Sequence, residues 1–281
     1  MSAIPFAKAH GVGNDFLLLD EREVGGRDVA RLALTICDRH CGIGADGVVI
    51  LGAAPGVDAT FRIYNADGSE ATLSGNALRC AAAWLAREAA QPATLSFETR
   101  MGRRLVHFLR REGSAAVFRT EIGVPSFGAR DVPFHPAEPP SEPIVDFPLP
   151  AGDSAVSATV LHMGNPQCIV FVESWASVNW MGLGKIIERH PYFPDRTNVG
   201  FVRVVDRSTV EVRFWERGVG HTLASGTGSC ACAVAANLAG KCGRRVGVQL
   251  ERGQMDVNWR EDGVVELTGP AVIVAEGQFR L

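Results

Sequence analysis

Residues 74–76 read Ser-Gly-Asn, and residues 225–227, which lie 151 positions later, read Ser-Gly-Thr. The same offset relates Arg62-Ile63-Tyr64-Asn65 to Arg213-Phe214-Trp215-Glu216, and Gly13-Asn14 to Gly164-Asn165. A run of small, alanine-rich residues follows each Ser-Gly, as is typical of a helix. The sequence therefore predicts a duplicated half-domain with the same loop-to-helix corner in each copy. We expect the two corners to face each other across a cleft with a pseudo-twofold axis.

The composition is that of an ordinary globular protein without a basic surface. Of the 281 residues, 46% are hydrophobic and 21% are charged, and the net charge is −3. These values predict one large domain or two smaller ones, and no nucleic acid as a partner. No apolar stretch approaches the length of about 18 residues that spans a bilayer, so we expect no membrane association.

The cysteines indicate a reducing compartment. Their number is seven, which is odd, and their spacing forms no disulfide framework, so we expect reduced thiols in a cytoplasmic protein. Two pairs, Cys37 with Cys41 and Cys230 with Cys232, are close in sequence, but no second pair completes a tetrahedral site at the usual spacing. We expect buried side chains here and predict no metal.

Hydrophobic periodicity and turn residues predict mostly strands, with one long helix after each corner. The expected helices are 29–38, 75–89, 182–189 and 226–239. The expected strands are 4–9, 16–20, 48–51, 60–65, 95–99, 103–110, 115–121, 157–162, 167–171, 198–205 and 209–215. Between Val132 and Pro150 there are seven prolines, which predicts irregular structure and a boundary region between the halves. We therefore place the halves at 1–130 and 131–270.

The two corners carry the predicted chemistry. A helix that starts after Ser-Gly presents unpaired backbone N–H groups and the positive end of its dipole, which bind a carboxylate without a charged side chain. The starts are Gly75-Asn76-Ala77 and Gly226-Thr227-Gly228. The alternative is that Ser74 and Ser225 are only helix N-caps. The repeated spacing favours a carboxylate site, as does a polar residue, Asn65 or Glu216, that we expect to be buried on the strand before each corner.

Other polar residues are weaker candidates when taken alone. Asn14, Asn165 and Asn198 are expected at turns, where asparagine is common for backbone reasons. Arg217 follows Glu216 at a strand end and would place a guanidinium beside the second corner, where it could clamp a carboxylate through two hydrogen bonds. The alternative for these two residues is a surface ion pair, which contributes little.

Over nearly its whole length the chain resembles the diaminopimelate epimerase family. The matching motifs, in order, are His10-Gly11-Val12-Gly13-Asn14-Asp15-Phe16, Gly42-Ile43-Gly44-Ala45-Asp46-Gly47, Asn65-Ala66-Asp67-Gly68-Ser69-Glu70, Ser74-Gly75-Asn76, Gly164-Asn165-Pro166, Thr197-Asn198-Val199, Glu216-Arg217-Gly218 and Ser225-Gly226-Thr227-Gly228. The resemblance implies an α+β fold of two pseudo-symmetric domains, each a mostly antiparallel sheet wrapped around a central helix. It also implies that the last strand, 271–281, crosses back to the first domain.

The resemblance further implies an isomerase that interconverts LL- and meso-diaminopimelate, in lysine and peptidoglycan precursor synthesis, without pyridoxal phosphate or any other cofactor. In the family a cysteine at each corner removes or returns the α-proton, and the helix starts, here Gly75, Asn76, Gly226 and Thr227, hold the α-carboxylate. The distal end of the substrate, with its second carboxylate, would be held by Asn14, Asn65, Asn165, Asn198 and Arg217. The family suggests a homodimer.

This chain departs from the family pattern at the catalytic positions. Both cysteines are replaced by serine, Ser74 and Ser225, and Gln167 stands where the histidine that supports the first base would be. Glu216, which would support the second base, is retained. Serine is not ionised near neutral pH and needs an adjacent base, which glutamine cannot be. The neighbouring Cys80 and Cys230 lie too far into the helices to replace them. Three interpretations follow: an epimerase, an isomerase or dehydratase using Ser225 and Glu216 alone, or a binding protein for a dicarboxylic amino acid.

Overall fold

The computed structural model describes residues 3–87, 94–152 and 154–280. Its contacts divide the chain into two compact units, of which unit 1 is Met1–Thr120 with Thr268–Leu281 and unit 2 is Glu121–Leu267. The sequence predicted borders between the halves at 130/131 and 270/271. The borders of the two units lie at 120/121 and 267/268. No helix of the described chain is long and apolar enough to cross a membrane.

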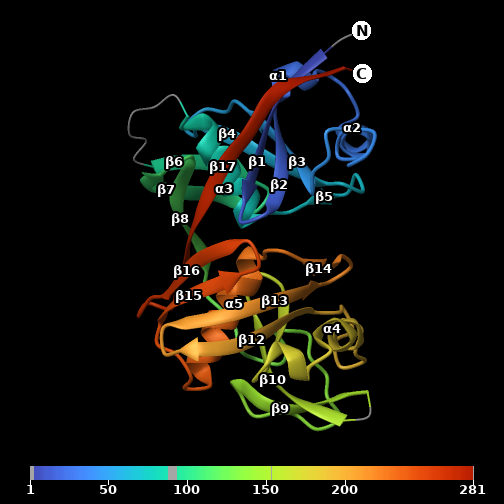
Figure 1. Ribbon diagram of the computed structural model, residues 1–281, viewed down its shortest axis with the longest axis vertical. Coiled ribbons are helices and arrows are strands. Elements are labelled where there is room, and N and C mark those ends of the chain that lie inside the picture. The colour runs from blue at the N-terminus through green and yellow to red at the C-terminus, as the bar shows by residue number, and fades with distance from the viewer. Residues whose placement is uncertain (1–2, 88–93, 153, 281) are drawn as a thin grey trace. The chain divides into compact units, whose positions relative to one another are not determined.

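Unit 1 contains nine strands, counting the end of the last one, and three helices among its described residues (Figure 1). In chain order they are β1 (Ala3–Gly11), β2 (Asn14–Asp20), α1 (Glu21–Val24), α2 (Val29–Ile36), β3 (Gly47–Gly52), β4 (Ala59–Asn65), β5 (Glu70–Ala71), α3 (Gly75–Leu85), β6 (Thr94–Thr99), β7 (Gly102–Glu112), β8 (Ala115–Gly123) and the end of β17 (Val265–Arg280). The pairing is mainly antiparallel, but β2 and β3 run parallel, as do β4 and β6.

Unit 2 has a similar order of elements. They are β9 (Ile144–Ala151), β10 (Ser154–His162), β11 (Pro166–Phe171), the 3-10 helix η1 (Trp175–Ser177), α4 (Trp180–Glu188), β12 (Asn198–Asp206), β13 (Thr209–Glu216), β14 (Gly220–Thr222), α5 (Gly226–Leu238), β15 (Arg245–Leu250) and β16 (Gly253–Trp259). Here β11 and β12 run parallel, as do β13 and β15.

The bounds of these elements confirm the duplication. Adding the sequence offset of 151 to β1 gives the bounds of β10, and adding it to β6 gives those of β15. The parallel pairs also correspond, since β2–β3 in unit 1 matches β11–β12 in unit 2. Each half of the chain therefore specifies the same succession of strands and helices.

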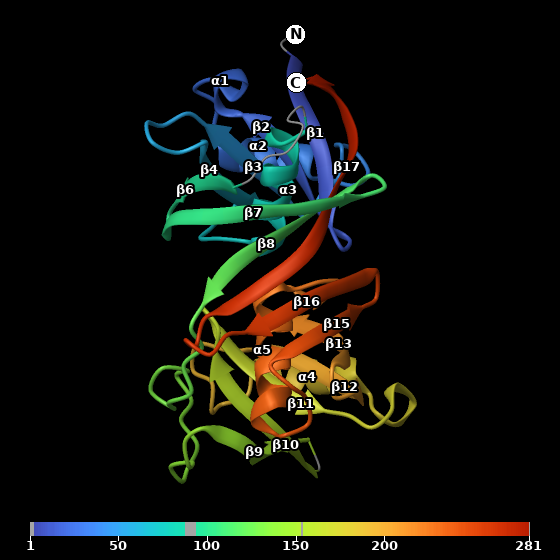
Figure 2. The ribbon, with the colours of Figure 1, turned by 90° about the vertical axis from the view of Figure 1, so that its left-hand side faces the viewer.

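The strand beside β1 comes from the far end of the chain. Residues 272–280 of β17 pair antiparallel with residues 3–10 of β1, and Figure 2 shows the two strands side by side. In unit 2 the equivalent neighbour of β10 is β9, which directly precedes it in sequence. The C-terminal end of the chain thus completes the sheet of the N-terminal unit.

Helices α3 and α5 are buried on nearly all sides. In α3 every residue from Asn76 to Ala83 is buried, and in α5 every residue from Gly228 to Ala236. Strands β1, β2, β3 and β7 all contact α3. The alanine-rich sequence explains this packing, because small side chains let strands approach a helix closely from several directions.

Part of the proline-rich region is regular, so the prediction of irregular structure across 132–150 was wrong at its end. Residues 144–151 form β9, which includes Pro148 and Pro150. Strand β9 pairs antiparallel with β10, and prolines are tolerated in a strand at positions where no partner needs the missing N–H donor.

Helix ends also differ from the predictions. The helix expected at 75–89 ends at Leu85, with positions 88–89 lying outside the described residues, and the helix expected at 29–38 ends at Ile36. The helix expected at 182–189 begins earlier, at Trp180, because Asn179 caps it by accepting the Gly182 N–H at 3.1 Å.

Candidate functional site

In unit 1 the first corner is built on the start of α3. Ser74 has extended backbone angles and its hydroxyl accepts the Ala77 N–H at 3.3 Å, so it is the N-cap of the helix. An N-cap satisfies only one of the four amides that a helix start leaves unpaired. Ser74 thus caps the helix, and the cap is compatible with an anion at the other three amides of the helix start, which include those of Gly75 and Asn76.

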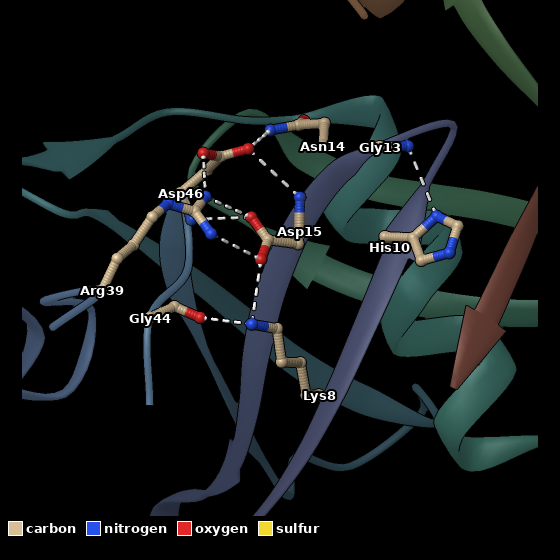
Figure 3. Close-up of polar contacts among 8 residues, drawn as sticks. All are labelled: Lys8, His10, Gly13, Asn14, Asp15, Arg39, Gly44 and Asp46. Atoms are coloured by element: carbon tan, nitrogen blue, oxygen red, sulfur yellow. Dashed lines mark hydrogen bonds and ion pairs between the residues drawn. The ribbon is translucent and has the colours of Figure 1, made fainter. Parts of the chain in front are cut away.

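A chain of hydrogen bonds, buried at its Arg79 end and exposed at its Asp46 end, leads from this helix start to the β1–β2 hairpin. Asn76 is 2% exposed, and its Nδ2 donates to Oδ1 of Asn14 at 3.0 Å. Its own Oδ1 accepts from the guanidinium of Arg79, which is fully buried in the same helix. Asn14 in turn donates from Nδ2 to Oδ2 of Asp46 at 2.7 Å (Figure 3). Asn14 and Asn76 therefore belong to one network.

Two cations and two carboxylates form a cluster at the β1–β2 hairpin. Arg39 donates to both oxygens of Asp15, at 2.7 and 3.1 Å, and to Oδ1 of Asp46 at 2.8 Å. Lys8 Nζ lies 3.2 Å from Asp15 Oδ2 and donates to the Gly44 carbonyl at 2.6 Å (Figure 3). Burial acts to raise the pKa of Asp15, but the hydrogen bonds and charges of Arg39 and Lys8 outweigh it and hold that pKa below its ordinary value.

The Asn65 side chain makes its hydrogen bond within its own turn rather than with Asn14 or Asn76. It is exposed, and its Nδ2 donates to Ser69 Oγ at 2.9 Å within the turn that follows β4. The expectation that Asn65 is buried was wrong, because it is the last residue of its strand and the chain turns into solvent there. Glu216, its counterpart at the end of β13, is half-buried.

In unit 2 the second corner repeats the first. Ser225 is the N-cap of α5 and its hydroxyl accepts the Gly228 N–H at 3.1 Å. It is 5% exposed, and its carbonyl accepts the Ser229 hydroxyl at 2.6 Å. A Cβ at position 228 would lie 2.8 Å from Ser225 Oγ, so glycine is required for the cap to form. The two corners have nearly identical cap angles, φ −137° and −135°.

Gln167 joins a turn to this second helix start. It is 1% exposed, and its Nε2 donates to Asn165 Oδ1 at 2.6 Å and to Thr227 Oγ1 at 3.5 Å. On the parallel pair β11–β12 it stands opposite Asn198. The structure thus brings Gln167, Asn165 and Thr227 together within unit 2, and their roles as site residues stay a prediction.

Asn198 and Arg217 are connected through the backbone. Asn198 is 8% exposed and begins β12, so its expected place at a turn was only half right. Its Oδ1 accepts the Arg217 N–H at 2.9 Å, and its Nδ2 donates to the Pro166 carbonyl at 3.3 Å. The Arg217 side chain is exposed and donates to the Asp195 carbonyl at 3.1 Å.

Glu188, at the end of α4, is a residue that the sequence analysis missed. It is 2% exposed, and its Oε1 accepts the Gly218 N–H at 3.1 Å, directly after Arg217. Its carboxylate also pairs with Arg189 at 3.1 Å and with Arg196 at 3.4 Å. Glu188 therefore holds the turn that carries Arg217. A buried glutamate at a helix end has no sequence signal that separates it from an exposed one.

Replacing Glu188 by alanine is expected to destabilise the protein by about 2 kcal/mol. The change leaves the Gly218 N–H without its carboxylate, while the half-exposed arginines are partly compensated by water. The midpoint of urea unfolding measures the loss. Glu188→Gln, which keeps the acceptor, should lose less, and the exposed Glu173→Ala should lose almost nothing. Equal losses for Glu188→Ala and Glu173→Ala would contradict the assignment.

We expect His162 to make the free energy of unfolding fall at acidic pH. Burial lowers its pKa from the ordinary 6.5, Arg217 lowers it further, and Asp131 opposes both. The unfolded chain then binds a proton at a higher pH than the folded protein, so stability falls as the pH drops below about 6.5. His162→Gln should flatten this part of the profile of unfolding free energy between about pH 5 and 8, whereas the exposed His40→Gln should leave it unchanged.

The cysteines of the two corner helices, Cys80, Cys230 and Cys232, lie inside the helices rather than at their caps. All seven cysteines are free, and six of them are buried. Burial raises the pKa of Cys80 to about 12, and Cys230 is fully buried. Among the described residues there is no group of three or more histidine, cysteine or acidic side chains placed to hold a metal ion.

Comparison with known proteins identifies relatives over the full length. A family model described as diaminopimelate epimerase matches residues 6–127 and 159–274. A diaminopimelate epimerase of Pelotomaculum thermopropionicum is 41% identical over 277 residues, which are 98% of each chain. Among solved structures, a PhzF-family phenazine biosynthesis protein of Bacillus anthracis has a TM-score of 0.71 at 15% identity and full coverage of both chains. A predicted epimerase of Pseudomonas aeruginosa has a TM-score of 0.69 at 19% identity over 98% of both chains. The last two likenesses concern the fold.

Proposed function

Because this chain belongs to the diaminopimelate epimerase family, we propose that it is a cofactor-independent isomerase that interconverts LL- and meso-diaminopimelate. The observation that carries the proposal is the family match, which includes both helix-start corners. The partner is then a small amino acid with a second carboxylate. We also propose a cytoplasmic homodimer in which the sheet of each unit wraps around its long helix.

In the proposed reaction one group takes the α-proton of the substrate and another returns a proton on the opposite face. We assign these two positions to Ser74 and Ser225. Glu216 is assigned as the residue that supports Ser225, and Gln167 occupies the position at which the family's histidine would support the base at Ser74. The negative charge that develops on the α-carboxylate is stabilised by the helix starts, through the amides of Gly75, Asn76, Gly226 and Thr227. The distal end is assigned to Asn14, Asn65, Asn165, Asn198 and Arg217.

The serines set the expected rate. A cysteine titrates near 8.5, and lower at a helix start, whereas a serine hydroxyl stays protonated and needs a base beside it. Positioned proton transfer contributes about 10²–10⁴-fold to a rate, so losing part of it at both positions makes a slow enzyme. Gln167 is hydrogen-bonded through its amide and supplies no base.

Serine at both catalytic positions and glutamine at position 167 also favour a second candidate. This candidate is a homologue that binds the amino acid without exchanging its α-proton. Serine hydroxyls and a glutamine amide are hydrogen-bond donors for a carboxylate, but they do not ionise near neutral pH. A third candidate is an isomerase or dehydratase that uses only the second corner, through Ser225 and Glu216.

Deuterium exchange separates these candidates. The protein is incubated with LL- or meso-diaminopimelate in deuterated water, and incorporation at the α-carbon is followed by mass spectrometry. Exchange accompanied by the appearance of the other isomer supports the epimerase. Binding in a titration without exchange supports the binding protein, and loss of water from the substrate would indicate a dehydratase.

A further inference from the structure

The direction of the hydrogen-bond chain from Arg79 to Asp46 in unit 1 is fixed by its two ends. Arginine can only donate, so the Asn76 oxygen faces Arg79 and the Asn76 amino group faces Asn14. The Asn14 oxygen is then the acceptor, and its amino group faces Asp46, which as a carboxylate can only accept. Neither asparagine can turn over without placing two donors or two acceptors against each other.

Asp46 therefore fixes the orientation of the Asn14 side-chain amide. One hydrogen of that amide goes to Asp46 Oδ2 at 2.7 Å, in the geometry drawn in Figure 3. The same carboxylate oxygen accepts the Asp15 N–H at 3.1 Å, which ties Asp46 to the strand that Asn14 begins. The second amide hydrogen of Asn14 is held in a set direction, as a donor suited to a carboxylate.

The surrounding charges prevent Asp46 from repelling such a carboxylate. Asp46 and Asp15 are paired with Arg39 and Lys8, so the four side chains sum to zero. Arg39 bonds to both carboxylates at 2.7–2.8 Å. An anionic substrate approaching Asn14 therefore meets a neutral cluster rather than two bare negative charges.

We propose that Asp46 is a positioning residue for substrate binding, which acts through Asn14 by holding its amide toward the distal carboxylate of the substrate. This inference rests on the proposed function, since it takes Asn14 as a substrate contact. The proposal thus gives Asp46, a residue of the Gly-Ile-Gly-Ala-Asp-Gly stretch at 42–47, a role in which Asp46 does not itself touch the substrate.

Titration of diaminopimelate into a double-mutant series tests the inference. Asp46→Ala should weaken binding about tenfold, because the Asn14 donor is no longer fixed, whereas Asp46→Asn, which keeps an acceptor, should stay within about threefold of the wild type. Asn14→Ala with Asp46→Ala should bind as weakly as Asn14→Ala alone. If the two losses add, or if Asp46→Asn is as weak as Asp46→Ala, the proposal is overturned.

A second measurement needs no ligand. The side-chain amide signals of Asn14 in an NMR spectrum, assigned by their loss in Asn14→Ala, should shift strongly in Asp46→Ala and little in Asp46→Asn. Asp206→Ala is the matched control, because Asp206 also accepts a backbone N–H and a hydroxyl, those of Ser208, but in unit 2. Unchanged Asn14 signals in Asp46→Ala would overturn the proposal. Absence of diaminopimelate binding by the wild type would instead reject the proposed function and leave the NMR result to decide the role of Asp46.

Discussion

Replacing Ser74 and Ser225 together by cysteine is expected to raise the rate of α-proton exchange from diaminopimelate about 10²-fold or more. Each serine caps a helix whose positive end would lower the pKa of a thiol at the same place. A partly ionised thiolate and a thiol would then replace two hydroxyls that do not titrate near neutral pH. Deuterium incorporation, measured by mass spectrometry at constant substrate, gives the ratio of the two rates.

The single variants and a cysteine elsewhere provide the controls. Two-base chemistry needs both positions, so Ser74→Cys or Ser225→Cys alone should gain much less than the pair. Ser229→Cys places a thiol on the same helix but away from its start, and it should gain nothing. If the double variant exchanges no faster than the native protein although it binds the substrate, these serines do not occupy the acid–base positions, and the assignment fails.

Gly42→Ala is expected to lower the free energy of unfolding by about 3 kcal/mol and to displace Asp46. A Cβ at position 42 would lie 2.4 Å from the Thr35 carbonyl oxygen and 2.7 Å from that of Ile36. These are backbone atoms at the end of α2, so the strain cannot be relieved by a side-chain rotation. Chemical denaturation measures the loss, and the Asn14 amide signals report whether Asp46 has moved.

Gly26→Ala is the matched control, because nothing lies within 4 Å of a Cβ placed there. It should change the unfolding free energy by less than about 1 kcal/mol. A Gly42→Ala protein as stable as Gly26→Ala would mean that the loop after α2 packs differently. It would contradict the claim that this loop holds Asp46 in place.

The repeat and the helix starts were predictable from the sequence. Ser-Gly before an alanine-rich run specifies a capped, tightly packed helix by local rules, and its recurrence at Ser225 placed the second one. The hydrophobic patterns predicted most of the longer strands, whose bounds moved by at most three residues, whereas α1, β5, β9, η1 and β14 were not predicted.

What escaped prediction depends on contacts between distant residues. Asp46 was recognised as part of a motif, but only folding shows that it faces Asn14, because the pairing joins a loop to a hairpin 32 residues away. Glu188 carries no local sign that it is buried. Asn65 was misjudged because strand membership does not reveal which last residue emerges into solvent. The facing of the two corners stays a prediction.

The pairing of β1 with the end of β17 has a consequence for biosynthesis. Residues 3–10 are translated well before residues 272–280, which form the strand that pairs with them. Unit 2 is contiguous from Glu121 to Leu267 and can assemble during translation. The nascent first unit must meanwhile carry an open sheet edge beside β1, which is an aggregation hazard until residues 272–280 have been translated and can pair with it.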